Sequence, residues 1–285
     1  MAGSVSLIGG GAGWFVWREA PGWAAAALLH PSRHRIDARL VETTGTRRTE
    51  TFTGDGVRLA GWRFAAHGQH RGTVVYLHGV ADNRGSSIAP GERLAAQGFD
   101  VIAYDSRAHG DSDGDVCTYG YDEKRDLERV LDAVGAAGSP IVVIGSSLGA
   151  AVALQAAAED KRISAVVAAE SFSDLRTVAT ERAPAYLPRA IVRRAFAAAE
   201  AQGRFEIDAV SPVAAAARIS VPVMIIHGAL DHDTVPDHSR RIYDALTGPR
   251  RFLMVERAGH NQSLTESTWL AIEQWMEEVV MERNR

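Results

Sequence analysis

The sequence of 285 residues predicts an α/β protein built on a mostly parallel central sheet. Six short apolar runs alternate with segments of helical pattern from Thr73 to the C-terminal region. Parallel strands need crossover connections, and helices on both faces bury them, so continuous apolar runs of this kind are typical of such a sheet. A polar–apolar alternation around Gly54-Asp55-Gly56 comes first and indicates an antiparallel hairpin that supplies one edge.

The expected strands and helices follow one another in a regular order. The strands are residues 73–79, 101–105, 141–145, 164–170, 221–228 and 251–256. A segment of helical pattern follows each strand; in residues 122–138, for example, the apolar side chains recur on one helical face.

Residues 171–218 depart from this order. The stretch is long, rich in Ala and Arg and helical in pattern, and it is broken at Pro184, Pro188 and Pro212. We expect a small helical cap inserted between two strands. No linker composition divides the rest, so residues 48–285 are predicted to form one domain that carries this cap.

The N-terminal segment, residues 1–47, is apolar at its start and carries no charge before Arg18. A membrane span needs about 20 mostly apolar residues, whereas this run is shorter, rich in Gly, and interrupted by Arg18, Glu19 and Pro21. A signal peptide would begin with a positive stretch, which is missing. We expect a cytoplasmic protein whose N-terminal segment packs on the domain, with weak membrane association as the alternative.

Composition excludes several classes of partner. A formal net charge of −4 and a pI near 6.2 argue against nucleic-acid binding, which needs a basic surface. The single cysteine, Cys117, cannot form an intramolecular disulfide and is expected to be a packed thiol. No HExxH motif and no glycine-rich phosphate loop occur, so we expect neither a catalytic metal nor a nucleotide cofactor.

The strand at 141–145 runs directly into a helical segment through Gly-Ser-Ser-Leu-Gly. A reactive side chain on a sharp strand-to-helix turn needs small residues two positions before and two after it. Only Ser147 satisfies this spacing, with Gly145 and Gly149, whereas Ser146 fills the variable position. Ser147 is therefore the candidate nucleophile, and the alternative is a Ser/Gly helix start that only caps and packs.

A serine hydroxyl needs a base, and the base needs a carboxylate to orient it. Open α/β sheets place such groups on loops at the carboxyl ends of their strands. His260 follows the last strand and is the candidate base, while His227 is interpreted as structural. Asp231 and Asp233 both follow the strand before it; Asp231 is favoured as the acid and Asp233 is the alternative.

The order of Ser147, Asp231 and His260 resembles that of the α/β-hydrolase superfamily, and the resemblance extends from about Phe52 to the C-terminus. Four further segments resemble that superfamily's oxyanion loop, its Asp-x-Arg-x-His-Gly-x-Ser segment, its acid loop and its histidine loop: YLHGVADNRGS, YDSRAHGDSDG, IHGALDHDTVP and AGHNQ. The acid loop has one extra residue before Val-Pro. The short cap is most similar to single-domain serine esterases of the Bem46 and ABHD17 type.

The resemblance implies a function for the site. The backbone amides of Val80 and Leu148 would form the oxyanion hole, and Ser147, His260 and Asp231 would cleave a small-molecule carboxylic ester through an acyl-enzyme. An acyl thioesterase or a peptidase would use the same residues, and a catalytically silent binding module is the alternative from another class. Four cap residues could line an acyl pocket or only pack the cap: Phe172, Tyr186, Leu187 and Phe196.

Overall fold

The computed structural model describes the backbone of residues 8–37, 47–134 and 139–283, and the side chains of these ranges from Arg18 to Val279. Residues 1–7 and 38–46 of the expected N-terminal segment lie outside the described residues, as do residues 135–138 of the expected helix over 122–138.

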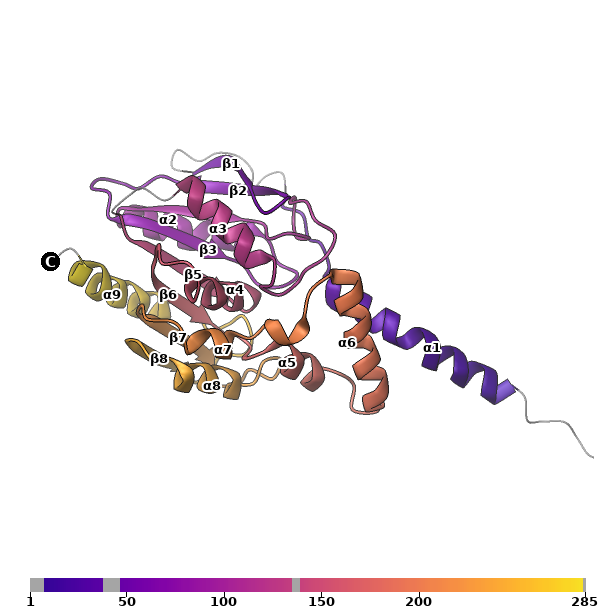
Figure 1. Cartoon of the computed structure of the whole chain (residues 1–285). Coiled ribbons are helices and arrows are strands. Elements are labelled where there is room, and N and C mark those ends of the chain that lie inside the picture. Colours follow the sequence, from indigo (N-terminus) through magenta and orange to yellow (C-terminus); the bar gives the residue numbers. More distant parts are fainter. Residues whose placement is uncertain (1–7, 38–46, 135–138, 284–285) are drawn as a thin grey trace, which may run out of the picture.

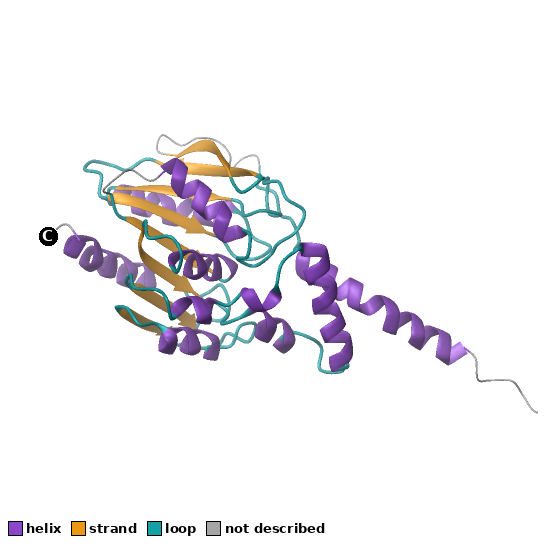
Figure 2. Cartoon of the chain, in the orientation of Figure 1, coloured by secondary structure: helices purple, strands orange, loops and turns teal. Residues whose placement is uncertain are grey.

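The fold is an eight-stranded sheet with helices on both faces (Figures 1 and 2). The strand order is β1-β2-β4-β3-β5-β6-β7-β8. Strand β1 pairs antiparallel with β2, and β2 pairs antiparallel with β4, whereas the remaining neighbours are parallel. The strands are β1 (Arg47–Thr53), β2 (Arg58–Phe64), β3 (Gly72–Leu77), β4 (Phe99–Tyr104), β5 (Ile141–Ser146), β6 (Ile163–Ala169), β7 (Val223–Gly228) and β8 (Arg250–Val255). The predicted mostly parallel sheet with an antiparallel hairpin at one edge is confirmed.

Two apolar layers cover the faces of this sheet. Because successive strand residues point to opposite faces, Val75 and Leu77 of β3 lie in one layer and Val74 and Tyr76 in the other. The first layer contains α3 (Glu123–Val134), α4 (Leu148–Ala157) and α8 (Asp237–Ala245). The second contains α2 (Ile88–Ala96) and α9 (Glu266–Arg283). Burial of each large aliphatic side chain stabilises the fold by about 2 kcal/mol. The packed layers therefore hold the strands in place, and with them the loops at the strand ends.

The chain between β6 and β7 holds four helical elements in the region that the sequence predicts to be a cap. They are α5 (Leu175–Glu181), α6 (Arg189–Gly203), η3 (Ile207–Ala209) and α7 (Pro212–Ala216). The N-terminal helix α1 (Ile8–Leu29) contacts α6, and its N-terminal half extends away from the sheet (Figure 1). Ala25 and Leu29 of α1 are buried in one apolar cluster with Phe196 and Phe205 of the cap region. Among the described helices, none combines the length and the apolar character needed to cross a bilayer.

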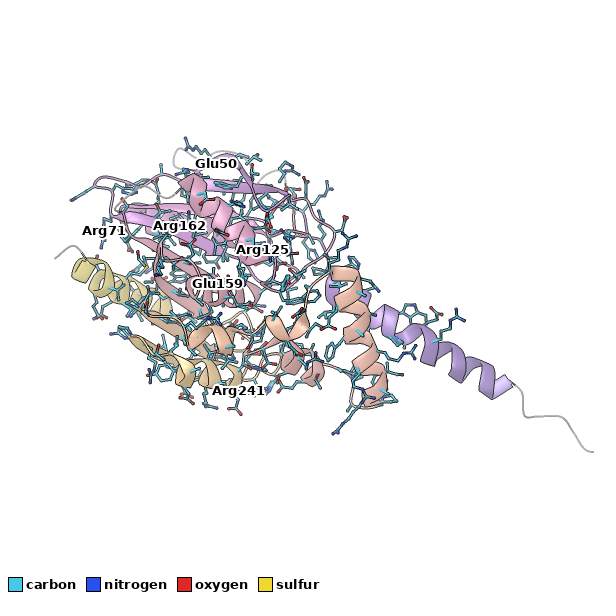
Figure 3. All side chains as sticks on the ribbon, in the orientation of Figure 1. Glu50, Arg71, Arg125, Glu159, Arg162 and Arg241 are labelled. Carbon is cyan, nitrogen blue, oxygen red and sulfur yellow. The ribbon has the colours of Figure 1, made fainter. Side chains whose placement is uncertain are left out.

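Charged side chains lie on strands, loops and helices alike, and Figure 3 labels six of them: Glu50, Arg71, Arg125, Glu159, Arg162 and Arg241. Lys124 of α3 pairs with Glu159 at 2.6 Å, and Arg162 pairs with Asp160 at 2.6 Å. Such surface pairs, which are exposed or only partly buried, contribute at most about 1 kcal/mol each, so the two apolar layers account for most of the stability. Cys117 is buried, as expected of a packed thiol.

Candidate active site

Ser147 occupies the turn between β5 and α4 in a strained conformation. Its φ of 51° and ψ of −110° are rarely adopted by a residue with a side chain. A Cβ at Gly145 would lie 2.3 Å from the carbonyl carbon of Gly149, and one at Gly149 would lie 2.2 Å from the carbonyl oxygen of Leu77. Both flanking positions therefore require glycine, and the tight turn presents the hydroxyl of Ser147 beyond the strand end.

The structure brings Ser147, His260 and Asp231 together. His260 Nε2 lies 3.1 Å from Ser147 Oγ, and His260 Nδ1 lies 2.7 Å from Asp231 Oδ2. Because a carboxylate only accepts hydrogen bonds, Nδ1 carries the proton of the neutral ring. Nε2 is then free to accept the proton of the Ser147 hydroxyl, which is the tautomer that a general base at this position needs.

The surroundings of Asp231 select it over Asp233. Asp231 Oδ1 accepts hydrogen bonds from the amides of Asp233 and Thr234, at 2.9 and 2.8 Å. Burial alone would raise the pKa of Asp231, but the hydrogen bonds from His227, His260 and the Thr234 amide outweigh it. The pKa therefore lies well below its usual value, and the carboxylate is ionised at neutral pH. Asp233 is exposed, and it contributes its backbone to the loop that holds Asp231.

His227 is buried behind Asp231, as expected of a structural residue, and it also contacts the acid. Its Nε2 donates to the carbonyl oxygen of Thr234 at 2.8 Å and lies 3.2 Å from Asp231 Oδ2. Its Nδ1 accepts from the hydroxyl of Ser239 at 2.6 Å. The rings of His227 and His260 therefore approach the same carboxylate oxygen, a contact that the position of His227 in the sequence does not predict.

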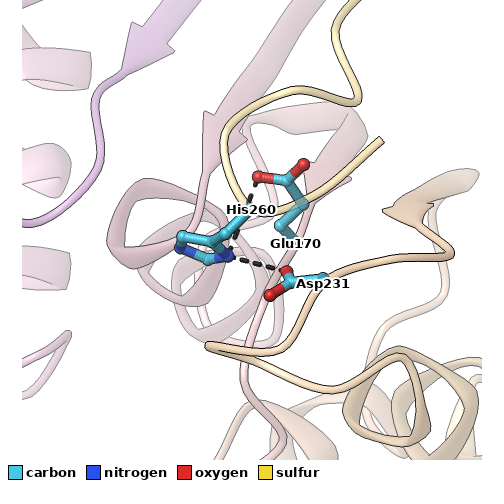
Figure 4. Close-up of side chains that lie close together, drawn as sticks. All are labelled: Glu170, Asp231 and His260. Atoms are coloured by element: carbon cyan, nitrogen blue, oxygen red, sulfur yellow. Dashed lines mark hydrogen bonds and ion pairs between the residues drawn. The ribbon is translucent and has the colours of Figure 1, made fainter. Parts of the chain in front are cut away.

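Glu170 is a residue of the site that sequence reasoning missed (Figure 4). It follows the last residue of β6, and its Oε2 lies 3.9 Å from His260 Nδ1. The sequence does contain a feature that points to Glu170: the expected strand at 164–170 ends in this carboxylate, at the edge of the sheet where active sites form.

Glu170, Asp231 and His260 together offer possible metal-ligand atoms within 4.8 Å of one another. Each is already engaged: Nδ1 of His260 binds Asp231, and the carboxylate of Glu170 accepts the amides of Asn261 and Ser263. A cation would have to displace these bonds, so the cluster is interpreted as a hydrogen-bonded network.

Val80 and Leu148 both lie next to Ser147. Val80 and Ser147 line one cavity, and a Cβ at Gly79 would lie 3.5 Å from the Cβ of Ser147. Leu148 is the first residue of α4, so its N–H has no acceptor within that helix, and the positive end of the helix dipole points toward Ser147. Val80 and Leu148 are therefore both neighbours of Ser147, and their role as oxyanion donors stays a prediction.

A cavity of about 630 Å³ opens above Ser147 and His260. Its other lining residues come from the β3 loop, α5 and the loops after β7 and β8: Val80, Glu181, Arg182, His232, Asp233, Val235 and Asn261. A second cavity, of about 530 Å³, adjoins it at Val80 and Asn261 and reaches Ser146, Glu170 and Trp269.

Four aromatic and aliphatic cap residues were expected to line an acyl pocket or to pack the cap, and the structure places them in three different surroundings. Leu187 and Phe196 line a largely apolar cavity of about 330 Å³ between α1, α5 and α6. Phe172 packs edge-on against Tyr119, with ring centroids 6.2 Å apart, and Tyr186 is 84% exposed.

A family model described as alpha/beta hydrolase fold matches residues 72–199. This match and the solved structures below show that the chain has the α/β-hydrolase fold, which is the fold that the sequence predicts.

Particular relatives extend over most of the chain. YqkD of Bacillus subtilis is 29% identical over 221 residues, which are 74% of this chain and 72% of YqkD. The esterase Pf2001 of Pyrococcus furiosus is 25% identical with a TM-score of 0.65, and the match covers 88% of this chain and 97% of that protein. The acetyl xylan esterase of Paenibacillus sp. R4 has the same fold at 19% identity and a TM-score of 0.65, over 93% of each chain.

Proposed function

We propose that this protein is a serine hydrolase that cleaves carboxylic esters through an acyl-enzyme. One observation carries the proposal: the 3.1 Å approach of His260 Nε2 to Ser147 Oγ, with Asp231 2.7 Å behind the ring. A hydroxyl, an imidazole and a carboxylate in this sequence of contacts can activate the hydroxyl as a nucleophile. The likeness to the Pyrococcus furiosus esterase supports a hydrolase.

In the first half of the reaction, Ser147 Oγ attacks the ester carbonyl and His260 Nε2 takes the hydroxyl proton. Asp231 accepts the Nδ1 hydrogen bond and stabilises the imidazolium that forms. The carbonyl oxygen becomes an oxyanion, which the amides of Val80 and Leu148 stabilise; each such donor contributes about 3 kcal/mol. His260 then returns its proton to the leaving alkoxide, the C–O bond breaks, and the acyl group remains on Ser147.

In the second half, water replaces the alcohol. His260 Nε2 accepts a proton from the water, whose oxygen attacks the acyl carbonyl. The same two amides stabilise the second oxyanion. Collapse of the tetrahedral intermediate breaks the bond to Ser147 Oγ, which recovers its proton from His260, and the carboxylic acid leaves.

The test is covalent labelling of the full chain with a fluorophosphonate, combined with hydrolysis of a p-nitrophenyl acyl ester. We expect the label on Ser147, activity on the ester, and loss of both in Ser147→Ala. Ser146→Ala is the matched variant, because it removes the adjacent hydroxyl and leaves Ser147 available for labelling. Ester hydrolysis that survives in Ser147→Ala would refute the assignment, and an inactive, unlabelled wild-type protein would indicate a silent binding module.

An acyl thioesterase or a peptidase would use the same three residues, because thioesters and amides pass through the same kind of oxyanion. The cavity above Ser147 has charged as well as apolar lining and does not by itself separate these substrates. A matched series of butyryl oxyester, thioester and anilide separates them, and we expect kcat/KM to be highest for the oxyester. We also propose that the protein is most similar to single-domain serine esterases of the Bem46 and ABHD17 type.

A further inference from the structure

Glu170 is buried at the carboxyl end of β6, between the strands that carry Ser147 and Asp231. Its carboxylate accepts hydrogen bonds from the amides of Asn261 and Ser263, the latter at 3.0 Å. These amides belong to the first and third residues after His260. Residue 170 has a φ of 57° and only 1% of its surface is exposed.

A carboxylate in this place is costly unless it has partners. Burial disfavours the ion, and a positive φ costs about 1 kcal/mol or more in a residue with a side chain. The hydrogen bonds from the two amides offset that cost, and His260 Nδ1 lies 3.9 Å from Oε2. A glutamine would supply one acceptor oxygen, and its NH₂ group would face a backbone N–H or the Nδ1 proton. The geometry therefore favours a carboxylate over an amide of the same size.

We propose that Glu170 is a positioning residue of the hydrolase site: it fixes the loop that carries His260 and places a second negative charge beside the imidazole. Asp231 then determines the tautomer of the His260 ring, and Glu170 determines the position of the His260 loop relative to Ser147. The inference rests on the proposed function, since it assigns a role within that site.

Two effects follow, and they can be measured separately. Release of the loop moves Nε2 away from Ser147 Oγ, which lowers kcat about tenfold to a hundredfold without a large change in KM. Loss of the charge also changes the pH profile. His260 acts as a base only when neutral, and the carboxylate favours the protonated ring. Removing that carboxylate, which lies 3.9 Å from Nδ1, is therefore expected to move the acidic limb of kcat/KM to lower pH.

The other charged groups near His260 stay in place in such a variant. Asp231 contacts Nδ1 directly, and His227 lies behind Asp231. Four further charged or titratable side chains line the cavity with His260: Glu181, Arg182, His232 and Asp233.

The experiment compares Glu170→Gln, Glu170→Asp and a control, Glu123→Gln, on the full chain. Glu123 is the matched control because it too is a buried carboxylate that accepts backbone amides, from Thr118 and Gly120 at 2.7 Å, and it contacts none of the three residues of the site. Fluorophosphonate titration counts competent sites, so kcat is expressed per site and unfolded molecules are not included.

We expect Glu170→Gln to lower kcat at nearly constant KM and to move the acidic limb of the pH profile of kcat/KM to lower pH. Glu170→Asp, which keeps the charge but shortens the side chain, is expected to lower kcat and leave the limb in place. Glu123→Gln is expected to lower thermal stability only. The inference is overturned if both Glu170 variants match Glu123→Gln in kcat and in pH profile. If Glu170→Gln fails to fold, the test depends on Glu170→Asp alone, and a kcat equal to that of wild type would overturn the inference. Absence of labelling and hydrolysis in wild type would instead overturn the proposed function, and this inference with it.

Discussion

Replacement of Asp231 by asparagine reverses a hydrogen bond without changing the shape of the site. The amides of Asp233 and Thr234 donate to Oδ1, so they hold the oxygen of the new amide in that position. The NH₂ group then takes the place of Oδ2, 2.7 Å from His260 Nδ1. A donor at this position requires Nδ1 to be the acceptor, which moves the ring proton to Nε2. In that tautomer His260 cannot accept the proton of Ser147.

The expected loss follows from this tautomer. A triad with the wrong histidine tautomer loses about 10⁴-fold in kcat, or about 5 kcal/mol of transition-state stabilisation. The assay is steady-state hydrolysis of p-nitrophenyl butyrate, with Asp233→Asn as the matched variant because it changes the adjacent exposed carboxylate of the same loop. Asp233→Asn is expected to stay within about threefold of wild type. If Asp231→Asn retains kcat within tenfold of wild type, or if Asp233→Asn shows the larger loss, the tautomer argument is wrong.

Three further substitutions test the packing and the buried charges. Gly149→Ala places a Cβ 2.2 Å from the carbonyl oxygen of Leu77 and is expected to cost about 4 kcal/mol in urea unfolding; a cost below 1 kcal/mol would contradict the tight turn. Burial and the nearby His78 lower the pKa of His109 to about 4. Because the histidine of the unfolded chain is protonated at a higher pH than that of the folded chain, the free energy of unfolding falls as the pH drops from about 6.5 to 4. His109→Phe is expected to reduce that pH dependence by about 3 kcal/mol, and an unchanged slope in urea unfolding at several pH values would contradict it. Leu29→Ala is expected to cost about 3 kcal/mol because Leu29 is fully buried against the cap, whereas a neutral result would mean that α1 packs only loosely.

Local sequence predicted the parts of this site that a short stretch of chain determines. The turn at Ser147 depends on Gly145 and Gly149, whose missing side chains admit the close backbone contacts, and their spacing is visible in the sequence. The strands that precede Ser147, Asp231 and His260 are continuous apolar runs, so their carboxyl ends could be placed at one edge.

Contacts between loops were not predictable in the same way. The choice between Asp231 and Asp233 depends on which carboxylate the loop turns inward, and this is decided by two backbone amides and by His227. Glu170 acts through Asn261 and Ser263, about ninety positions away in the chain. The packing of α1 on α6 likewise joins segments far apart in sequence, and the apolar run alone predicted neither the partner nor the contact face.

The covalent intermediate is the most direct test of the account. Rapid acid quench of the full chain with p-nitrophenyl acetate, followed by peptide mass spectrometry, measures whether an acetyl group is attached to the enzyme during turnover. The account predicts a mass increase of one acetyl group on the peptide that contains Ser147, together with a burst of p-nitrophenol equal to the concentration of enzyme. Turnover without any acylated peptide, or with the acetyl group on another residue, would contradict it.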